Sequence, residues 1–595
     1  LGATALKLSE RPLTNKINIG NEPINNTIVG FDLTYSHEIP FLTRLVDKLP
    51  IYSTKEKSTI TIEGEFAKLI PGNPGAIGKD GTAYLDDFEG SQSTIDVRTI
   101  SQWKLASTPQ GQPTLFPEGI FPLDTSLEYG FNRARLAWYN IDPLFWRNDS
   151  RTPSHIKNDA ITQSNHYSRE VLQTEVFPFK SVANGTTQNI STLDLAFYPS
   201  ERGQYNFDDG SGVGSGTTNN GKTLNNPSSR WGGIMRQIET TDFETSNVEF
   251  LMFWMMDPFD AVDGDANHSG GKLYFNLGDI SEDILKDDRK SVENAMPLAA
   301  INYTSGLNAN LVDTTIWGRV PTIPALVTAF DNTPSTRPFQ DIGLDGLNDA
   351  DEGFFFPGYS NYKDVTGNFD PAGDNHHHYR GDDYDGQALS ILERYKFHNG
   401  VDGNSNTSGQ DPNPNYSSAA TTRPDVEDIN TNNNLDFREN YYQYSVDLNP
   451  STVNSSNVGN NYINNVLQTT VRTADGSSKQ VNWYQFKIPI REPESVIGNI
   501  QDFKSIRFMR MFMKGFNKEV VLRFAKIDLV RGEWRRFSGN LLDPGEFLGN
   551  DDDATTFDVS AVNVEENSSK TPVNYIIPPG IDREINPNPS TGGLG

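Results

Sequence analysis

The chain has 595 residues and a formal net charge of −28, with 78 acidic and 50 basic residues and no cysteine. The acidic excess excludes nucleic acid as a partner, because binding a phosphate backbone requires basic side chains that replace its counterions; a solvated surface and cation binding both explain it. The absence of cysteine excludes disulfides, thiolate metal sites and cysteine nucleophiles.

The first segment with a clear pattern is residues 29–36, VGFDLTYS, where apolar and polar side chains alternate, and residues 60–66 repeat the pattern. This period is typical of a lipid-facing barrel strand and equally of a half-buried antiparallel sheet. Residues 41–49 between them suit a short amphipathic helix. Two strands cannot close a barrel, so in a membrane the partner strands would lie outside this chain. The sequence contains no apolar run of 18 residues, the length expected of a transmembrane helix.

From about residue 84 to 540, short strand-like runs alternate with loops. Residues 248–256, VEFLMFWMM, are apolar on both faces and predict a central strand that is covered on both sides. Many strands without a βαβ rhythm predict an antiparallel sandwich or jelly roll. Alternating side chains predict strands at 272–277 and 483–488. Further strands are expected at 134–140, 193–198, 232–239, 441–448, 505–513 and 519–530.

Two segments within an acidic, Asn/Asp/Gly-rich region have the ligand spacing of a calcium loop. In the first, Asp428–Glu439, oxygen ligands are expected from Asp428, Asn430, Asn432, Asn434, Asp436 and Glu439. In the second they are expected from Asp341, Asp345, Leu347, Asp349 and Glu352, with Leu347 offering its carbonyl. There Gly343 stands at loop position 3, so one ligand is missing or supplied by water. A cluster of Asx turns without metal explains both segments as well.

Catalytic motifs are absent from the sequence: there is no H-E-x-x-H, no G-x-S-x-G and no P-loop. His376, His377 and His378 are adjacent and point in different directions, so we expect a solvated loop there. We therefore expect a protein that is not an enzyme.

Four segments resemble the SprA/Sov family, the outer-membrane translocons of the type IX secretion system of Bacteroidetes. They are GTAYLDDFEGSQSTIDVRTISQW at 81–103, FLTRLVDKLP at 41–50, RARLAWYNIDPLFW at 133–146 and VVLRFAKIDLVRGEWRRF at 520–537. Members of this family are several times longer than 595 residues, so the chain resembles a portion of one.

The order of landmarks also resembles the galactose-binding-type jelly rolls that serve as carbohydrate-binding modules. By that resemblance, an opening carboxylate segment and a terminal strand aspartate would hold a structural calcium ion, at Asp86, Asp87, Glu89 and Asp528. Capping of strands or pairing with nearby arginines explains these carboxylates as well.

Together these resemblances imply a mainly β chain: a jelly-roll domain inserted between strands of a large outer-membrane β-barrel. The implied function is export of folded cargo and support of gliding motility, with this region capping or lining the pore. Implied partners are a PorV-like outer-membrane shuttle protein, a periplasmic plug protein and cargo with type IX C-terminal signals. The implied location is the cell outer membrane, with a large extracytoplasmic domain. The alternatives are a surface carbohydrate-binding or adhesion module and an accessory region of a glycan hydrolase.

The expected organisation has five parts: a barrel hairpin with a short helix at 1–72, the first part of the jelly roll at 73–284, the acidic insertion at 285–440, the last jelly-roll strands at 441–540, and a C-terminal segment leading to further barrel strands at 541–595.

Overall fold

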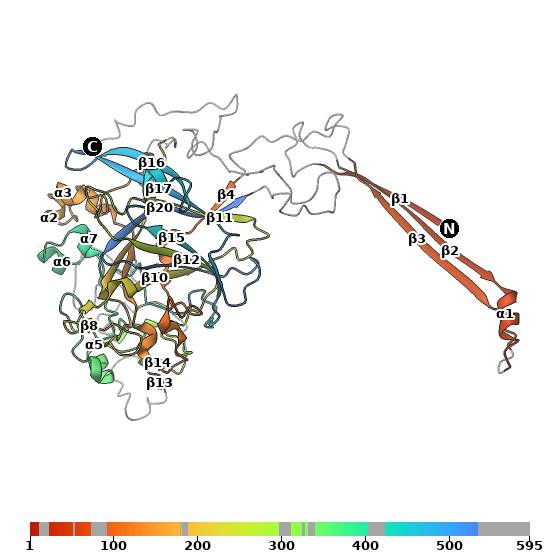
Figure 1. Cartoon of the computed structure of the whole chain (residues 1–595), viewed down its shortest axis with the longest axis horizontal. Helices are drawn as coiled ribbons and strands as arrows, with labels where there is room; N and C mark the ends of the chain where they lie inside the picture. The colour runs from red at the N-terminus through yellow and green to blue at the C-terminus, as the bar shows by residue number, and fades with distance from the viewer. Residues whose placement is uncertain are drawn as a thin grey trace. The chain divides into compact units, whose positions relative to one another are not determined.

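A computed structural model describes residues 1–10, 23–50, 54–72, 92–178, 180, 188–296, 311–323, 328–330, 339–402 and 423–532. The chain divides into two compact units, Leu1–Gly90 and Ser91–Gly595 (Figure 1). The predicted calcium ligands Asp86, Asp87 and Glu89 and the C-terminal segment 541–595 lie outside the described residues.

The first unit contains a three-stranded antiparallel sheet in the order β1-β2-β3. Its strands are β1 (Gly2–Ser9), β2 (Asn25–Glu38) and β3 (Thr59–Ile70), and α1 (Pro40–Val46) connects β2 to β3. The two strands and the helix predicted between residues 29 and 66 are therefore confirmed. Strand β1 was not predicted, and it extends the sheet beyond a hairpin.

The register of this sheet separates apolar from polar side chains. Phe31 lies opposite Phe66 and Tyr35 opposite Ile62, whereas Asp32 on the other face lies opposite Glu65. The four apolar side chains are each more than half exposed. Within the described part of the first unit, the sheet therefore presents an exposed apolar face.

The second unit is built on two antiparallel sheets. One sheet has six strands, in the spatial order β18-β15-β12-β19-β10-β5. The other has seven strands: six lie in the spatial order β16-β17-β11-β20-β7-β6, and β4 pairs with β20. The six-stranded sheet comprises β5 (Lys104–Leu105), β10 (Trp231–Gln237), β12 (Gly271–Asp279), β15 (Asn440–Leu448), β18 (Ser495–Ile497) and β19 (Phe508–Lys514). The seven-stranded sheet comprises β4 (Gln92–Asp96), β6 (Ala134–Tyr139), β7 (Leu193–Arg202), β11 (Val248–Met256), β16 (Ile463–Arg472), β17 (Ser478–Pro489) and β20 (Val520–Gly532).

Short elements fill the connections between these strands. Two small hairpins pair β8 (Thr217–Thr218) with β9 (Thr223–Leu224) and β13 (Val312–Thr314) with β14 (Arg319–Pro321). The α-helices of this unit are α2 (Ser154–Lys157), α3 (Ala160–Gln163), α4 (Gln173–Val176), α5 (Asp349–Phe355), α6 (Asp382–Gly386) and α7 (Ile391–Arg394). Among the residues that the structure describes, none of the helices combines the length and the apolar character needed to cross a bilayer.

Strand β11 explains why its sequence is apolar on both faces. Phe253 contacts Phe275 of the six-stranded sheet, with ring centroids 5.5 Å apart, so this face of β11 lies between the two sheets. On the opposite face, Trp254 and Met256 pack in a second apolar cluster with Trp483 and Val171. The prediction of a central strand that is covered on both sides is confirmed. The other eight strands predicted in this unit are also present, as β6, β7, β10, β12, β15, β17, β19 and β20.

A long connection leaves and re-enters the six-stranded sheet at one place. Strands β12 and β15 are hydrogen-bonded neighbours, and their register pairs Asp279 with Asn440. Residues 280–439, which we call the β12–β15 excursion, thus stand where a hairpin turn would stand. The excursion carries both segments with calcium-loop spacing.

Candidate cation site in the β12–β15 excursion

The segment Asp428–Glu439 folds as a series of Asx turns. The Asp428 carboxylate accepts hydrogen bonds from the backbone N–H groups of Asn432 and Asn433, at 3.0 and 2.8 Å. The side-chain oxygen of Asn430 accepts from Asn432 N–H at 3.0 Å, and that of Asn432 accepts from Asn434 N–H at 2.7 Å. Asn433 has a φ of 67°, a conformation that asparagine tolerates. The loop backbone therefore donates hydrogen bonds to the side-chain oxygens of Asp428, Asn430 and Asn432.

The acidic groups at the end of this segment are also engaged. Asp436 accepts hydrogen bonds from Arg507 at 2.7 and 2.6 Å. Glu439 accepts from Arg510 at 3.0 Å through each of its oxygens. The carboxylate of Glu282 accepts from the backbone N–H groups of Ile429 and Asp436, at 2.8 and 3.1 Å. The structure thus has the arrangement expected of the Asx-turn alternative.

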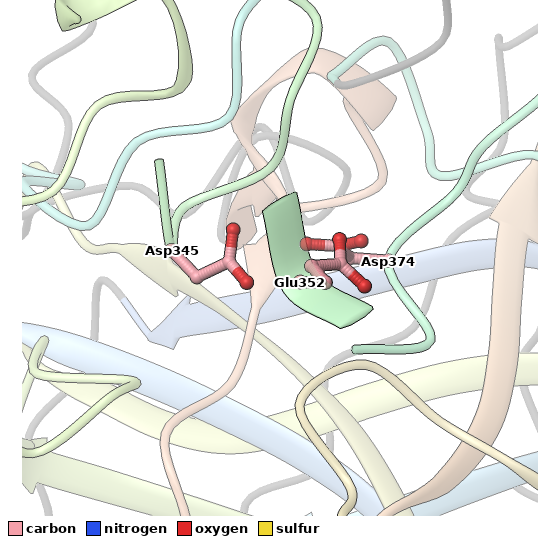
Figure 2. A group of neighbouring side chains, drawn as sticks. All are labelled: Asp345, Glu352 and Asp374. Carbon is pink, nitrogen blue, oxygen red and sulfur yellow. The ribbon is translucent and has the colours of Figure 1, made fainter. Parts of the chain in front are cut away.

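The segment Asp341–Glu352 has a different geometry. Asp345, Glu352 and Asp374 bring ligand oxygens within 4.8 Å of one another, and the three residues are only 2%, 1% and 8% exposed. Figure 2 shows their carboxylates facing a common space. A second group, formed by Asp349, Glu352 and Asp370, satisfies the same distance limit and shares Glu352. Within the described residues, neither group contains a residue of 428–439.

Helix α5 holds two of these carboxylates on one face. It begins at Asp349 after the N-cap Asn348, whose side chain accepts a hydrogen bond from Asp351 N–H at 3.0 Å. Asp349 and Glu352 are three residues apart, so both side chains lie on the same side of the first turn. The cap therefore fixes where the helix starts and which way these two carboxylates point.

The loop 370–374 supplies the other carboxylates, and backbone contacts hold it against α5. Ala372 N–H donates to Glu352 at 2.8 Å, and Gly373 N–H donates to Asp370 at 2.7 Å. The buried Arg202 guanidinium donates to the backbone carbonyl oxygens of Asp370 and Pro371. These backbone contacts therefore hold the loop in place beside α5.

The glycine at loop position 3 has a steric reason. Gly343 adopts a φ of +71°, and a Cβ atom there would collide with the Asp374 carboxylate. The sequence-based expectation took Gly343 as a missing ligand. The structure instead shows that its lack of a side chain makes room for Asp374, which enters from elsewhere in the chain.

Three buried oxygens of the cluster have no hydrogen-bond partner: one Oδ2 each from Asp345, Asp370 and Asp374. The ion pairs of the described residues include none of these three carboxylates, nor that of Glu352. Burial, together with neighbouring carboxylates, raises the pKa of Asp345, Glu352 and Asp374 well above its usual range. Burial also raises the pKa of Asp349 to about 6. Burial raises the pKa of Asp370 as well; Arg202 opposes that rise in part, as Arg319 does for the pKa of Asp345. The site therefore gathers carboxylates that form no ion pair with a described Lys or Arg.

Of the remaining predicted ligands, Asp341 and Leu347 line the same cavity as Glu352 and Asp374. Asp341 lies beside Glu293, whose pKa is raised first by burial and then by Asp341. Leu347 is buried and donates its N–H to Asp345 at 3.0 Å. Asp528 lies in β20 opposite Asp96 of β4, and Lys526 approaches its carboxylate to 3.0 Å.

The histidine segment differs from the expected solvated loop. His377 and His378 are buried, and His377 Nε2 lies 3.1 Å from the Asp383 carboxylate. Burial is also the main reason why the pKa of His378 falls to about 3. The prediction of a solvated loop was wrong, because these rings pack against neighbouring aromatic side chains such as Tyr384 and Tyr379.

Sequence reasoning missed Asp370 and Asp374. They belong to the short segment Asp-Pro-Ala-Gly-Asp, in which proline and glycine indicate a tight turn with an acidic residue at each end. That signal was present, but nothing in a single sequence pairs this turn with a loop about 25 residues earlier.

Part of the chain matches a known family. Residues 359–592 match the SprA_N family, which is described as motility related/secretion protein. This part of the chain is thus a SprA-family segment, as the resemblance predicted. The match includes Asp370 and Asp374 and begins after Asp345 and Glu352. No curated protein matches the chain.

Proposed function

We propose that this chain is part of the outer-membrane protein-conducting translocon of the type IX secretion system. In this proposal it helps to export folded cargo and supports gliding motility. The family match supports a motility- or secretion-related role. The observation that carries the finer proposal is the sheet β1-β2-β3, which exposes one apolar face.

The sheet has the properties that a barrel wall needs. A barrel strand requires about 9–11 residues to cross the hydrocarbon core, and β2 and β3 have 14 and 12. Phe31, Tyr35, Ile62 and Phe66 would face lipid, and the face that carries Asp32 and Glu65 would face the lumen. In the described sheet β1 and β3 are each paired on one side only. An open edge is unfavourable in lipid, so further strands of the full protein would complete the wall.

The second unit would be a jelly-roll-type domain that is inserted between barrel strands and caps or lines the pore. A domain attached at the rim would be able to control passage without any covalent chemistry. Its partners would be a PorV-like shuttle protein, a periplasmic plug protein and secreted cargo. Its location would be extracytoplasmic, at the outer membrane.

The test is a deletion in the full-length protein that replaces residues 81–543 with a short linker. We expect loss of export of native cargo, or leakage of the outer membrane to large solutes, in cells where the barrel still assembles. A matched variant that lacks only residues 280–439 separates the excursion from the two sheets, because Asp279 and Asn440 are already neighbours. Normal export with an intact permeability barrier would remove this region from the transport role. Tight glycan binding by the 595-residue chain would then favour an adhesion module.

A further inference from the structure

We propose that Asp345, Glu352 and Asp374 bind a divalent cation of the calcium type, with Asp349 and Asp370 contributing from the other side of Glu352. This site is a composite of two segments, the loop and first turn of α5 and the loop 370–374. It is independent of the transport role proposed above.

The unpartnered oxygens are the first argument. Asp345, Asp370 and Asp374 each bury an Oδ2 that receives no hydrogen bond, and all three residues are at least nine-tenths buried. Burying a polar oxygen without a partner is unfavourable, because the oxygen loses its hydrogen bonds to water and gains none in return. Two of these residues, Asp345 and Asp374, belong to one group with Glu352, and Asp370 belongs to the second group that shares Glu352. Their unpartnered oxygens are therefore unfavourable unless a further group binds them.

Charge is the second argument. Carboxylates that share a site repel one another, so they cannot all be ionised without a cation. Two other buried carboxylates of this chain are neutralised by arginine: Asp208 pairs with Arg230 and Asp194 pairs with Arg523. No described Lys or Arg plays this part for Asp345, Glu352 or Asp374. A bound cation would supply the missing positive charge.

The ligand set selects the kind of ion. Both groups consist of carboxylates alone, without histidine, and the chain has no cysteine. Hard oxygen ligands suit calcium or magnesium and not zinc or copper. Calcium accepts six to eight oxygens in flexible geometry, whereas magnesium keeps most of its waters. Several carboxylates that converge from two segments therefore favour calcium.

The site also has access to solvent. A cavity of about 320 Å³ is lined by Asp349, Glu352 and Asp374, and also by Glu293, Asp341 and His376. A space of this size admits an ion and several waters, which would complete the coordination shell. The bound ion would tie the α5 segment to the loop 370–374 and so stabilise this part of the excursion.

The experiment is a metal titration of the 595-residue chain after treatment with EDTA. We expect calcium to raise the melting temperature, because a ligand that binds only the folded state stabilises it. Terbium, used as a luminescent calcium substitute, should give sensitised emission that calcium suppresses. Asp374→Asn and Glu352→Gln should each lower calcium affinity on the order of 100-fold. Changes to residues that only support a metal ligand already lower affinity by about 10- to 100-fold, and these two changes remove a ligand charge directly.

The controls keep the test decisive. Asp374→Asn removes a repelling charge, so in EDTA it should melt at or above the temperature of the wild type while losing the calcium response. That pattern distinguishes a lost ligand from a misfolded variant. Asp428→Asn, in the segment with the better calcium-loop spacing, should keep the response. The proposal is overturned if the wild type shows neither a melting shift nor terbium emission, or if Asp428→Asn loses the response and Asp374→Asn keeps it.

Discussion

The Glu439 carboxylate accepts a hydrogen bond from each terminal nitrogen of Arg510, both at 3.0 Å, and the Arg510 side chain is completely buried. Arg510 lies in the middle of β19, between β10 and β12. Glu439 also accepts from Ser281 N–H at 3.1 Å. Glu439, at position 12 of the predicted calcium loop, is thus the counter-ion of a buried arginine in the six-stranded sheet.

The first prediction concerns this pair. Glu439→Gln should lower the free energy of unfolding by about 3–5 kcal/mol, because it leaves a buried arginine without its partner charge. Asp447→Asn is the matched control, since Asp447 pairs with Lys272 and both side chains are more than a third exposed. That change should cost less than about 1 kcal/mol. Urea denaturation measures both, and equal effects would contradict the assignment of Glu439.

The second prediction concerns the contact between the two sheets. Phe253→Ala should destabilise the second unit by about 3–5 kcal/mol, because it leaves a cavity among Phe275, Phe486 and Phe524. Phe354→Ala removes the same ring from a side chain that is 85% exposed, and it should have little effect. The measurement is again the free energy of unfolding. A small effect at Phe253 would mean that the sheets do not share this core.

The third prediction concerns pH. Burial raises the pKa of Asp257 to about 6, with Asp260 adding repulsion, while Phe259 N–H and the Tyr484 hydroxyl favour the charged form. The folded state therefore holds this proton more tightly than the unfolded chain. Its contribution to stability is present below pH about 4 and is lost as the pH rises to about 6, by roughly 3 kcal/mol.

Asp257→Asn should remove this dependence. The measurement is the free energy of unfolding of both proteins from pH 4 to 7. As the pH rises, the variant should become more stable relative to the wild type. A difference that stays constant across that range would show that Asp257 is not held in its protonated form.

The fourth prediction concerns the apolar face of the first unit and rests on the proposed function. Phe31→Arg should impair assembly of the full-length protein, because a charge at a lipid-facing midplane position costs about 2–4 kcal/mol in barrels. Asp32→Arg, one residue along on the opposite face, should be tolerated. Protease resistance of the protein in outer-membrane fractions reports assembly. Equal tolerance of the two changes would point to a sheet in water.

The strands could be predicted because their signals are local. The alternation in β2 and β3 and the apolar run of β11 each occupy a single segment. Strand β1 was missed, since GATALKLS alternates only weakly and its pairing with β2 is a tertiary fact. The short β5 and β18 leave almost no pattern to read.

The candidate site was predictable only in part. Calcium-loop spacing drew attention to Asp345, Asp349 and Glu352, which do lie together in the structure. The same spacing did not indicate that two arginines some 70 residues later would bind the last two carboxylates of the loop. Arg507 donates hydrogen bonds to Asp436, and Arg510 donates to Glu439. Spacing along one segment describes what that segment can offer. What meets it from other segments depends on tertiary contacts.

The pairing of β12 with β15 and β19 has a consequence for the order of events during synthesis. Both neighbours of β12 come after residue 439, so a growing chain that has completed β12 has no partner for either edge of this strand. Unpaired strand edges invite contacts with other chains. Some 160 further residues must emerge before β15 can dock. An excursion that folds by itself would hold the two ends close together and shorten the time during which β12 is unprotected.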